Sequence, residues 1–176
     1  MKERQLFANY LKNQRNFQGV NLHKADLEGL SLQRINLTRA DLSGANLKQT
    51  DLSGACLVQA NLTNVDLTSA HLVGANLTEI NLIGADLSGA DLTGVDLSNA
   101  DLRCANLHNA NLSKAKLQEV NLGGADLTNA NLCDATIVNT DLSVADTQDI
   151  SLEGSQRWEL EEPLSITSPH WVSWAG

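Results

Sequence analysis

A leucine recurs at every fifth position over most of this chain, and this period decides what the chain can fold into. The segment 40–44, ADLSG, is typical. Segments like it follow one another without an insertion from Arg15 to Gly154, which makes 28 consecutive pentapeptides in 140 of the 176 residues. A helix buries a stripe of period 3.6, and a half-buried strand buries a face of period 2. A period of five fits neither, so each pentapeptide is predicted to be a short extended stretch followed by a turn.

The positions within a pentapeptide have separate roles, which we count from its central residue i. Position i is Leu in 25 of 28 units, the exceptions being Phe17, Ile137 and Thr147, and position i−2 is Ala in 17 and Val, Ile or Leu in eight. Both positions are expected to face an apolar interior. Position i−1 is Asp in 11 units and Asn in 11, which are short side chains that satisfy backbone groups at turns. Position i+2 is Gly in 10 units, Asn in five and Asp in two, which predicts a positive φ.

Such units cannot bury an apolar face alone, but coiling solves the problem, because four turns bring the chain back above itself. Successive coils would then pair through backbone hydrogen bonds at a strand-like spacing of ~4.8 Å. The A-(D/N)-L-x-x pattern resembles that of the pentapeptide repeat family. The resemblance implies an all-β fold, a right-handed quadrilateral β-helix with four pentapeptides per coil. It predicts about seven coils in a rod of roughly 34 Å, with a structural core that includes Phe17, Leu27, Leu47, Leu67, Leu87, Leu107 and Leu127.

The two ends leave the repeat, and an open solenoid edge needs protection against edge-to-edge pairing. Residues 1–14 place Leu6, Phe7, Tyr10 and Leu11 at helical spacing, which predicts a short N-terminal helical cap over the first coil. Residues 155–176 contain all three tryptophans and both prolines. We expect this C-terminal tail to be either a cap over the last coil or a homodimer contact, since Trp is enriched at interaction hot spots. The predicted domains are therefore the cap at 1–14, the β-helix at 15–154 and the tail at 155–176.

Composition excludes several classes of partner and site. A net charge of −9 argues against direct nucleic-acid binding. No apolar run approaches the ~20 residues that span a bilayer, and the N-terminus has no signal-peptide stretch, so we expect a cytoplasmic protein without a membrane contact. The three cysteines, Cys56, Cys104 and Cys133, match neither a disulfide framework nor a zinc pattern and are expected to be free thiols.

No residue pattern predicts catalysis, a cofactor or a metal. The i−1 aspartates follow from the repeat and imply neither a buried pocket nor a raised pKa. The histidines are not placed to share a metal, because they fall on different faces or in the tail: His23, His71, His108 and His170. An interior of Leu and Ala offers no convergent polar groups to a ligand. The chain is therefore predicted not to be an enzyme.

The charges can be sorted by face, because every fourth pentapeptide shares a side of the coil. Counted in chain order, the four faces begin at Arg15, Val20, Ala25 and Leu30. The first, second and fourth have net charges of 0, −1 and −2, whereas the third has a net charge of −6. We name this third side the acidic face. Its one Lys or Arg residue is Lys48, and it carries seven carboxylates: Asp26, Glu28, Asp66, Asp86, Asp126, Asp146 and Asp149. Two interpretations stay open, a surface that binds a partner and a solvated surface that keeps the rod soluble.

Two functions follow from these features. The first is a non-catalytic interaction or scaffold rod that binds an unknown protein partner. The second comes from the resemblance, since some family members imitate B-DNA and inhibit or protect DNA gyrase. DNA carries about 20 charges over the same ~34 Å, and the −9 of this chain is under half of that. The uninterrupted repeat removes loop-dependent protection, whereas a dimer through the tail would lengthen the rod and favour mimicry.

Overall fold

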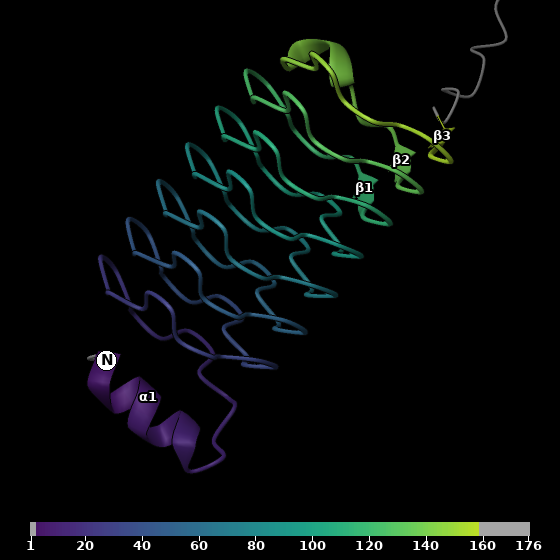
Figure 1. The fold of residues 1–176 in the computed structure, drawn as a ribbon. Coiled ribbons are helices and arrows are strands. Elements are labelled where there is room, and N and C mark those ends of the chain that lie inside the picture. Colours follow the sequence, from purple (N-terminus) through teal and green to yellow (C-terminus); the bar gives the residue numbers. More distant parts are fainter. Residues whose placement is uncertain (1–2, 159–176) are drawn as a thin grey trace, which may run out of the picture.

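A computed structural model describes residues 3–158 of the chain. It contains one α-helix, α1 (Glu3–Leu11), and three short strands, β1 (Lys116–Gln118), β2 (Thr136–Val138) and β3 (Gln156–Trp158). A 3₁₀ helix, η1 (Leu142–Val144), lies between β2 and β3. Between α1 and η1 the chain winds into stacked coils, which Figure 1 shows from the side.

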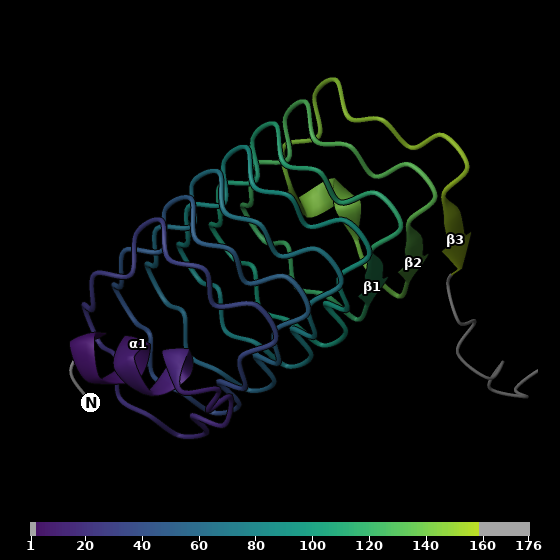
Figure 2. The same cartoon turned by 60° about the horizontal axis from the view of Figure 1, so that its bottom comes forward.

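Each coil is 20 residues long. Isolated parallel β-bridges join i−1 residues 20 positions apart, from Asn16 with Asn36 to Asn131 with Ser151. The three strands continue the same stacking, because β1 pairs with β2 and β2 with β3, all parallel and in the same register of 20. Four pentapeptides therefore make one turn of a β-helix, and Figure 2 shows the open outline of each coil behind the one before it, in an oblique view.

Residues 86–90, which run from i−1 of one unit to i−2 of the next, show how the repeat satisfies the five backbone N–H groups of each period. Asp86 N donates to Val65 O of the preceding coil at 2.9 Å, and Leu87 N and Gly89 N donate to the next coil at 2.7 and 2.9 Å. Ala90 N closes the turn on Leu87 O at 3.0 Å. The remaining donor, Ser88 N, is 2.9 Å from the Asp86 carboxylate. A short acceptor at i−1 thus completes the hydrogen bonding of the unit, which explains why Asp and Asn predominate there.

The interior is a column of apolar side chains from positions i and i−2. Leu27, Leu47, Leu67, Leu87 and Leu127 have no exposed surface, and Leu107 and Phe17 are 1 % and 5 % exposed. Two threonines replace apolar residues at i−2 and remain buried, Thr50 and Thr140. Their hydroxyl groups donate to Leu27 O and Leu117 O, each at 2.8 Å. Among the described residues, no buried side-chain N or O atom lacks a hydrogen-bond partner.

The positive φ predicted for position i+2 is confirmed. It occurs at 27 of the 28 sites, 10 of which are Gly, with φ between 48° and 69°. The exception is Val144, where η1 replaces the regular turn. Val144 is also the one β-branched residue at i+2 in the repeat, and branching at Cβ makes the left-handed region especially unfavourable.

We expect Val144→Gly to allow a regular turn at this site and to raise the free energy of unfolding by about 0.5–1 kcal/mol. The matched variant is Asn129→Val, which places a branched side chain at an i+2 residue with φ 57°. This change is expected to lower the free energy of unfolding by about 1–2 kcal/mol. Urea denaturation measures both values, and shifts in the same direction would show that turn geometry is not what distinguishes Val144.

The two ends of the β-helix differ. Helix α1 lies over the first coil (Figures 1 and 2), where Leu6 is fully buried and the Tyr10 hydroxyl donates to Gln33 O at 3.1 Å. At the other end the ladder continues past Gly154, because Gln156 pairs with Thr136. The apolar column is less well covered there, since Leu152 is 39 % exposed. We predicted that the tail, residues 155–176, is a cap over the last coil or a homodimer contact. Residues 159–176 of this tail lie outside the described part of the chain.

Candidate interaction surface

The coils bring most of the acidic face into one column. Its i−1 residues are linked in series by β-bridges from each coil to the next: Asp26, Asn46, Asp66, Asp86, Asn106, Asp126 and Asp146. Glu28 lies at i+1 in the first unit of this face, and Asp149 lies at i+2 in the last. Asp26, Glu28, Asp146 and Asp149 are exposed, whereas Asp66, Asp86 and Asp126 are half-buried.

Several carboxylates of the column have hydrogen-bond or ion-pair partners within it, which the charge count alone does not reveal. Asn46 donates from Nδ2 to Asp26 at 3.1 Å and to Glu28 at 2.9 Å, and Asn106 donates to Asp86 at 3.2 Å. Lys48 forms an ion pair with Asp66 at 3.0 Å. Two bridged pairs have no Asn between them, Asp66 with Asp86 and Asp126 with Asp146. Like charges at one coil spacing repel, so these pairs favour a cationic partner.

Hydrogen bonds lower the pKa of two carboxylates of the column, Asp66 and Asp126. Partial burial raises the pKa of Asp66, but the hydrogen bonds from Thr68 and Lys48 lower it, and the net pKa lies below its usual 3.8. The pKa of Asp126 is lowered mainly by the backbone N–H and the hydroxyl of Thr128. The same cause acts away from this face, because bonds from Ser43 lower the pKa of Asp41. These carboxylates therefore carry full charge at neutral pH.

A lowered carboxyl pKa makes stability depend on acid. The contribution of such a group is fully present above its unfolded pKa and is lost as pH falls through the folded pKa. We expect the melting temperature to be constant from pH 7 to 5 and to fall below about pH 4. Circular dichroism melts between pH 7 and 2 measure this. Asp41→Asn with Asp126→Asn should reduce the fall, because an amide oxygen accepts the same N–H without titrating. A melting temperature that rises below pH 4 would mean that repulsion between stacked carboxylates outweighs these bonds.

The other candidate residues form no chemical site in the described residues. His23 and His108 bond singly to hydroxyl groups, of Ser43 at 2.8 Å and Thr128 at 2.6 Å; His170 lies outside the described part. Within residues 3–158, no group of three His, Cys, Asp or Glu side chains is placed to hold a metal ion. The three cysteines are free thiols. The same residues include no helix long and apolar enough to cross a membrane.

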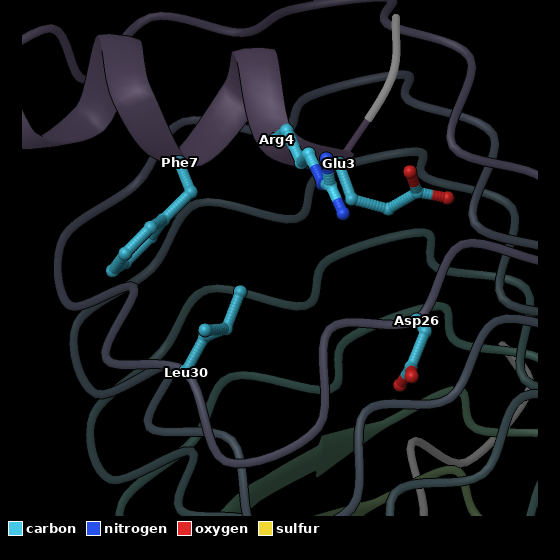
Figure 3. Close-up of a pocket in the computed structure, with 5 residues that line it drawn as sticks. All are labelled: Glu3, Arg4, Phe7, Asp26 and Leu30. Carbon is cyan, nitrogen blue, oxygen red and sulfur yellow. The ribbon is translucent and has the colours of Figure 1, made fainter.

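Two pockets border the N-terminal helix, and sequence reasoning did not find them. One has a volume of about 190 Å³ and lies between α1 and the first coil, where Phe7 and Leu30 form its apolar part and Glu3, Arg4 and Asp26 its polar part (Figure 3). The other has a volume of about 500 Å³ and lies near the end of α1, lined by Tyr10, Asn13, Arg15, Gln33 and Arg34. The one feature of the sequence that points to this region is the basic composition of residues 1–40, which hold seven of the 12 Lys and Arg residues.

Comparison with known proteins agrees with this architecture. The family model described as pentapeptide repeats matches residues 16–54, 45–82, 80–118 and 110–146. A pentapeptide repeat protein from Nostoc PCC 7120, alr5209, is 33 % identical, with a TM-score of 0.55, over 69 % of this chain and 95 % of that one. A second structure is that of HetL, a pentapeptide repeat protein described as involved in heterocyst differentiation regulation, from Nostoc sp. strain PCC 7120. It is 28 % identical over 89 % of this chain and 94 % of that one, with a TM-score of 0.23.

A third structure is that of QnrB1, described as a plasmid-mediated fluoroquinolone resistance protein. It is 20 % identical over 78 % of this chain and 79 % of that one, with a TM-score of 0.46. No curated protein sequence matches the chain. The family model covers most of the β-helix, and pentapeptide repeat proteins are known as right-handed quadrilateral β-helices. The chain therefore belongs to the pentapeptide repeat family.

Proposed function

We propose that this protein is a non-catalytic rod that binds a protein partner through its acidic face. The observation that carries the proposal is the concentration of charge, −6 of the total −9, on one side of a regular solenoid. Residues on that side are fixed by backbone pairing between coils, so the carboxylates are held in place before a partner arrives. A complementary partner would present Lys and Arg side chains at a similar spacing. The expected location is the cytoplasm.

The ends of the rod complete the proposal. Residues 1–14 would cap the first of seven coils formed by 15–154. Burial of Leu6 and Tyr10 between α1 and the first coil supports the cap. Residues 155–176 would cover the last coil or join two copies. The exposed Leu152 and the pairing of β3 with β2 support a role for the segment that follows.

The proposal requires that the acidic face be dispensable for folding. We expect the triple variant Asp66→Asn, Asp86→Asn, Asp126→Asn to keep the native fold, with each change altering stability by less than about 0.5 kcal/mol. The reason is that Asn at i−1 makes the same turn bond, as Asn106 does to His108 N at 3.0 Å. Circular dichroism spectra and urea denaturation measure this. Loss of the fold would show that these carboxylates are structural rather than a surface for partners.

Partner capture from a cell lysate tests the surface when it is run with two triple variants. The first is the acidic-face variant just described. The matched variant is Asp41→Asn, Asp91→Asn, Asp141→Asn, which makes the same charge change at i−1 on the two sides adjoining the acidic face. All six aspartates accept a bond from a Ser or Thr at i+1. We expect proteins that bind the native and matched chains but not the acidic-face variant. Equal retention by all three chains would contradict the proposal.

DNA mimicry is the second candidate, and the bridged carboxylate column favours it. Five aspartates stacked along one side of a rod resemble part of a phosphate strand, although the total charge is under half that of DNA of equal length. The test is gyrase supercoiling at graded protein and salt concentrations. Salt-sensitive inhibition that the acidic-face variant loses would support mimicry. An absence of inhibition at tens of micromolar would exclude this candidate and leave the interaction rod.

A further inference from the structure

The pocket lined by Tyr10, Asn13, Arg15, Gln33 and Arg34 has a chemistry opposite to that of the acidic face. It lies where the chain leaves α1 and enters the first coil. Two guanidinium groups and two amide side chains line about 500 Å³, a volume within the range of small-molecule sites.

Arg15 is held in a fixed position at this pocket. Its guanidinium carbon lies 3.9 Å from the centroid of the Tyr10 ring, and its Nη1 donates to Tyr10 O at 2.8 Å and Gln14 O at 3.1 Å. Tyr10 is itself fixed, because it is 9 % exposed and its hydroxyl donates to Gln33 O. Both bonds of Arg15 use Nη1, so its Nε and Nη2 hydrogens can serve a ligand.

Arg34 brings a second positive charge. Its aliphatic part lies against Gly54 of the next coil, whose lack of a side chain leaves room for it. Lys48, Arg103 and Lys116 each form an ion pair with an aspartate. Neither Arg15 nor Arg34 forms an ion pair with a carboxylate in the part of the chain that the structure describes, and both residues line the pocket.

The surrounding charge also favours an anion. Residues 1–40 contain seven Lys and Arg and three Asp and Glu, whereas residues 41–176 contain five and 18. The rod is therefore basic at its N-terminal end and acidic over the rest. The carboxylate of Asp51, which Gln33 contacts, accepts hydrogen bonds from Gln33 Nε2 and Ser53 N rather than forming an ion pair with Arg15 or Arg34.

We propose that this pocket binds a small polyvalent oxyanion between Arg15 and Arg34. A guanidinium group presents paired N–H donors that match two oxygens of a carboxylate or a phosphate, which a point charge on Lys does not. The ligand class is therefore a small molecule with several carboxylate or phosphate oxygens. This site is distinct from the acidic face, so it does not depend on the proposed partner.

Titration with pyrophosphate and with citrate, at constant ionic strength, tests the proposal on the full chain. The readout is the amide NMR shift of Asn13, Arg15, Gln33 and Arg34, up to about 10 mM ligand. We expect saturable shifts centred on these residues. Binding of pyrophosphate alone would assign a phosphate ligand, binding of citrate alone would assign a carboxylate ligand, and binding of both would assign an oxyanion site without preference.

The matched pair of variants is Arg34→Gln and Lys114→Gln. Both residues are exposed, occupy i+2 on the same side of the coil and have positive φ, but Lys114 lies four coils away, at ~19 Å. We expect Arg34→Gln to weaken binding about fivefold or more and Lys114→Gln to change it less than about 1.5-fold. The absence of saturable shifts with either anion would overturn the proposal. Equal weakening by the two variants would also overturn it, because the effect would then be one of net charge.

Discussion

Leu87→Ala is expected to lower the free energy of unfolding by about 2–5 kcal/mol. Leu87 has no exposed surface and packs in the middle of the apolar column. Its neighbours above and below are held by ladder hydrogen bonds to the adjacent coils, so the column cannot collapse to fill the space. The destabilisation therefore includes both the lost transfer free energy and the cavity. Urea denaturation followed by circular dichroism measures it.

The control for Leu87→Ala is the next residue. Ser88 lies at i+1, where its backbone N–H rather than its side chain bonds to Asp86. Ser88→Ala is expected to change stability by less than about 0.5 kcal/mol. Similar effects of the two substitutions would refute the assignment of positions i and i+1, and with it the burial of every fifth residue.

Glu79→Pro is expected to lower stability by at least about 3 kcal/mol. Glu79 lies at i+2 with φ 57°, and its N–H donates to Ser98 O at 2.9 Å. Proline fixes φ near −65° and has no N–H, so the variant loses both the turn and a bond of the ladder. Thermal and urea denaturation give the value.

Glu79→Gly at the same position should have the opposite sign. Glycine adopts a positive φ without the Cβ penalty, so we expect a gain of up to about 1 kcal/mol. The side chain of Glu79 accepts a bond from Gln59 at 2.7 Å, and its loss makes the gain smaller. If Glu79→Pro were tolerated, the left-handed turn would not be what closes each side of the coil.

Most of the fold follows from the sequence because each repeat position has one dominant physical requirement. Leu at i fills the column, Asp or Asn at i−1 bonds the i+1 amide, and position i+2 takes a positive φ. The structure differs from the regular repeat at two places, Val144 and the segment after Gly154. Val144 breaks the turn through its branched Cβ, a signal that was present in the sequence. The ladder continues to Trp158 because backbone pairing requires no particular side chain.

The surfaces were harder to predict than the fold. Charge counting located the acidic face, but it did not show that Asn46 and Asn106 donate to Asp26 and Asp86, since such bonds depend on side-chain orientation. The basic pocket depends on where the end of α1 meets the first coil, which brings Arg15 near Arg34. The five-residue period does not predict how α1 packs against the first coil.

The most direct test of the acidic face as a partner surface is the affinity of a captured partner for three chains, measured by isothermal titration at low and high salt. The chains are the native protein, the acidic-face variant and the matched variant. The account predicts that the acidic-face variant binds about tenfold or more weakly, that the matched variant binds within about threefold of the native chain, and that salt weakens native binding. Equal weakening of both variants, or an affinity independent of salt, would contradict it.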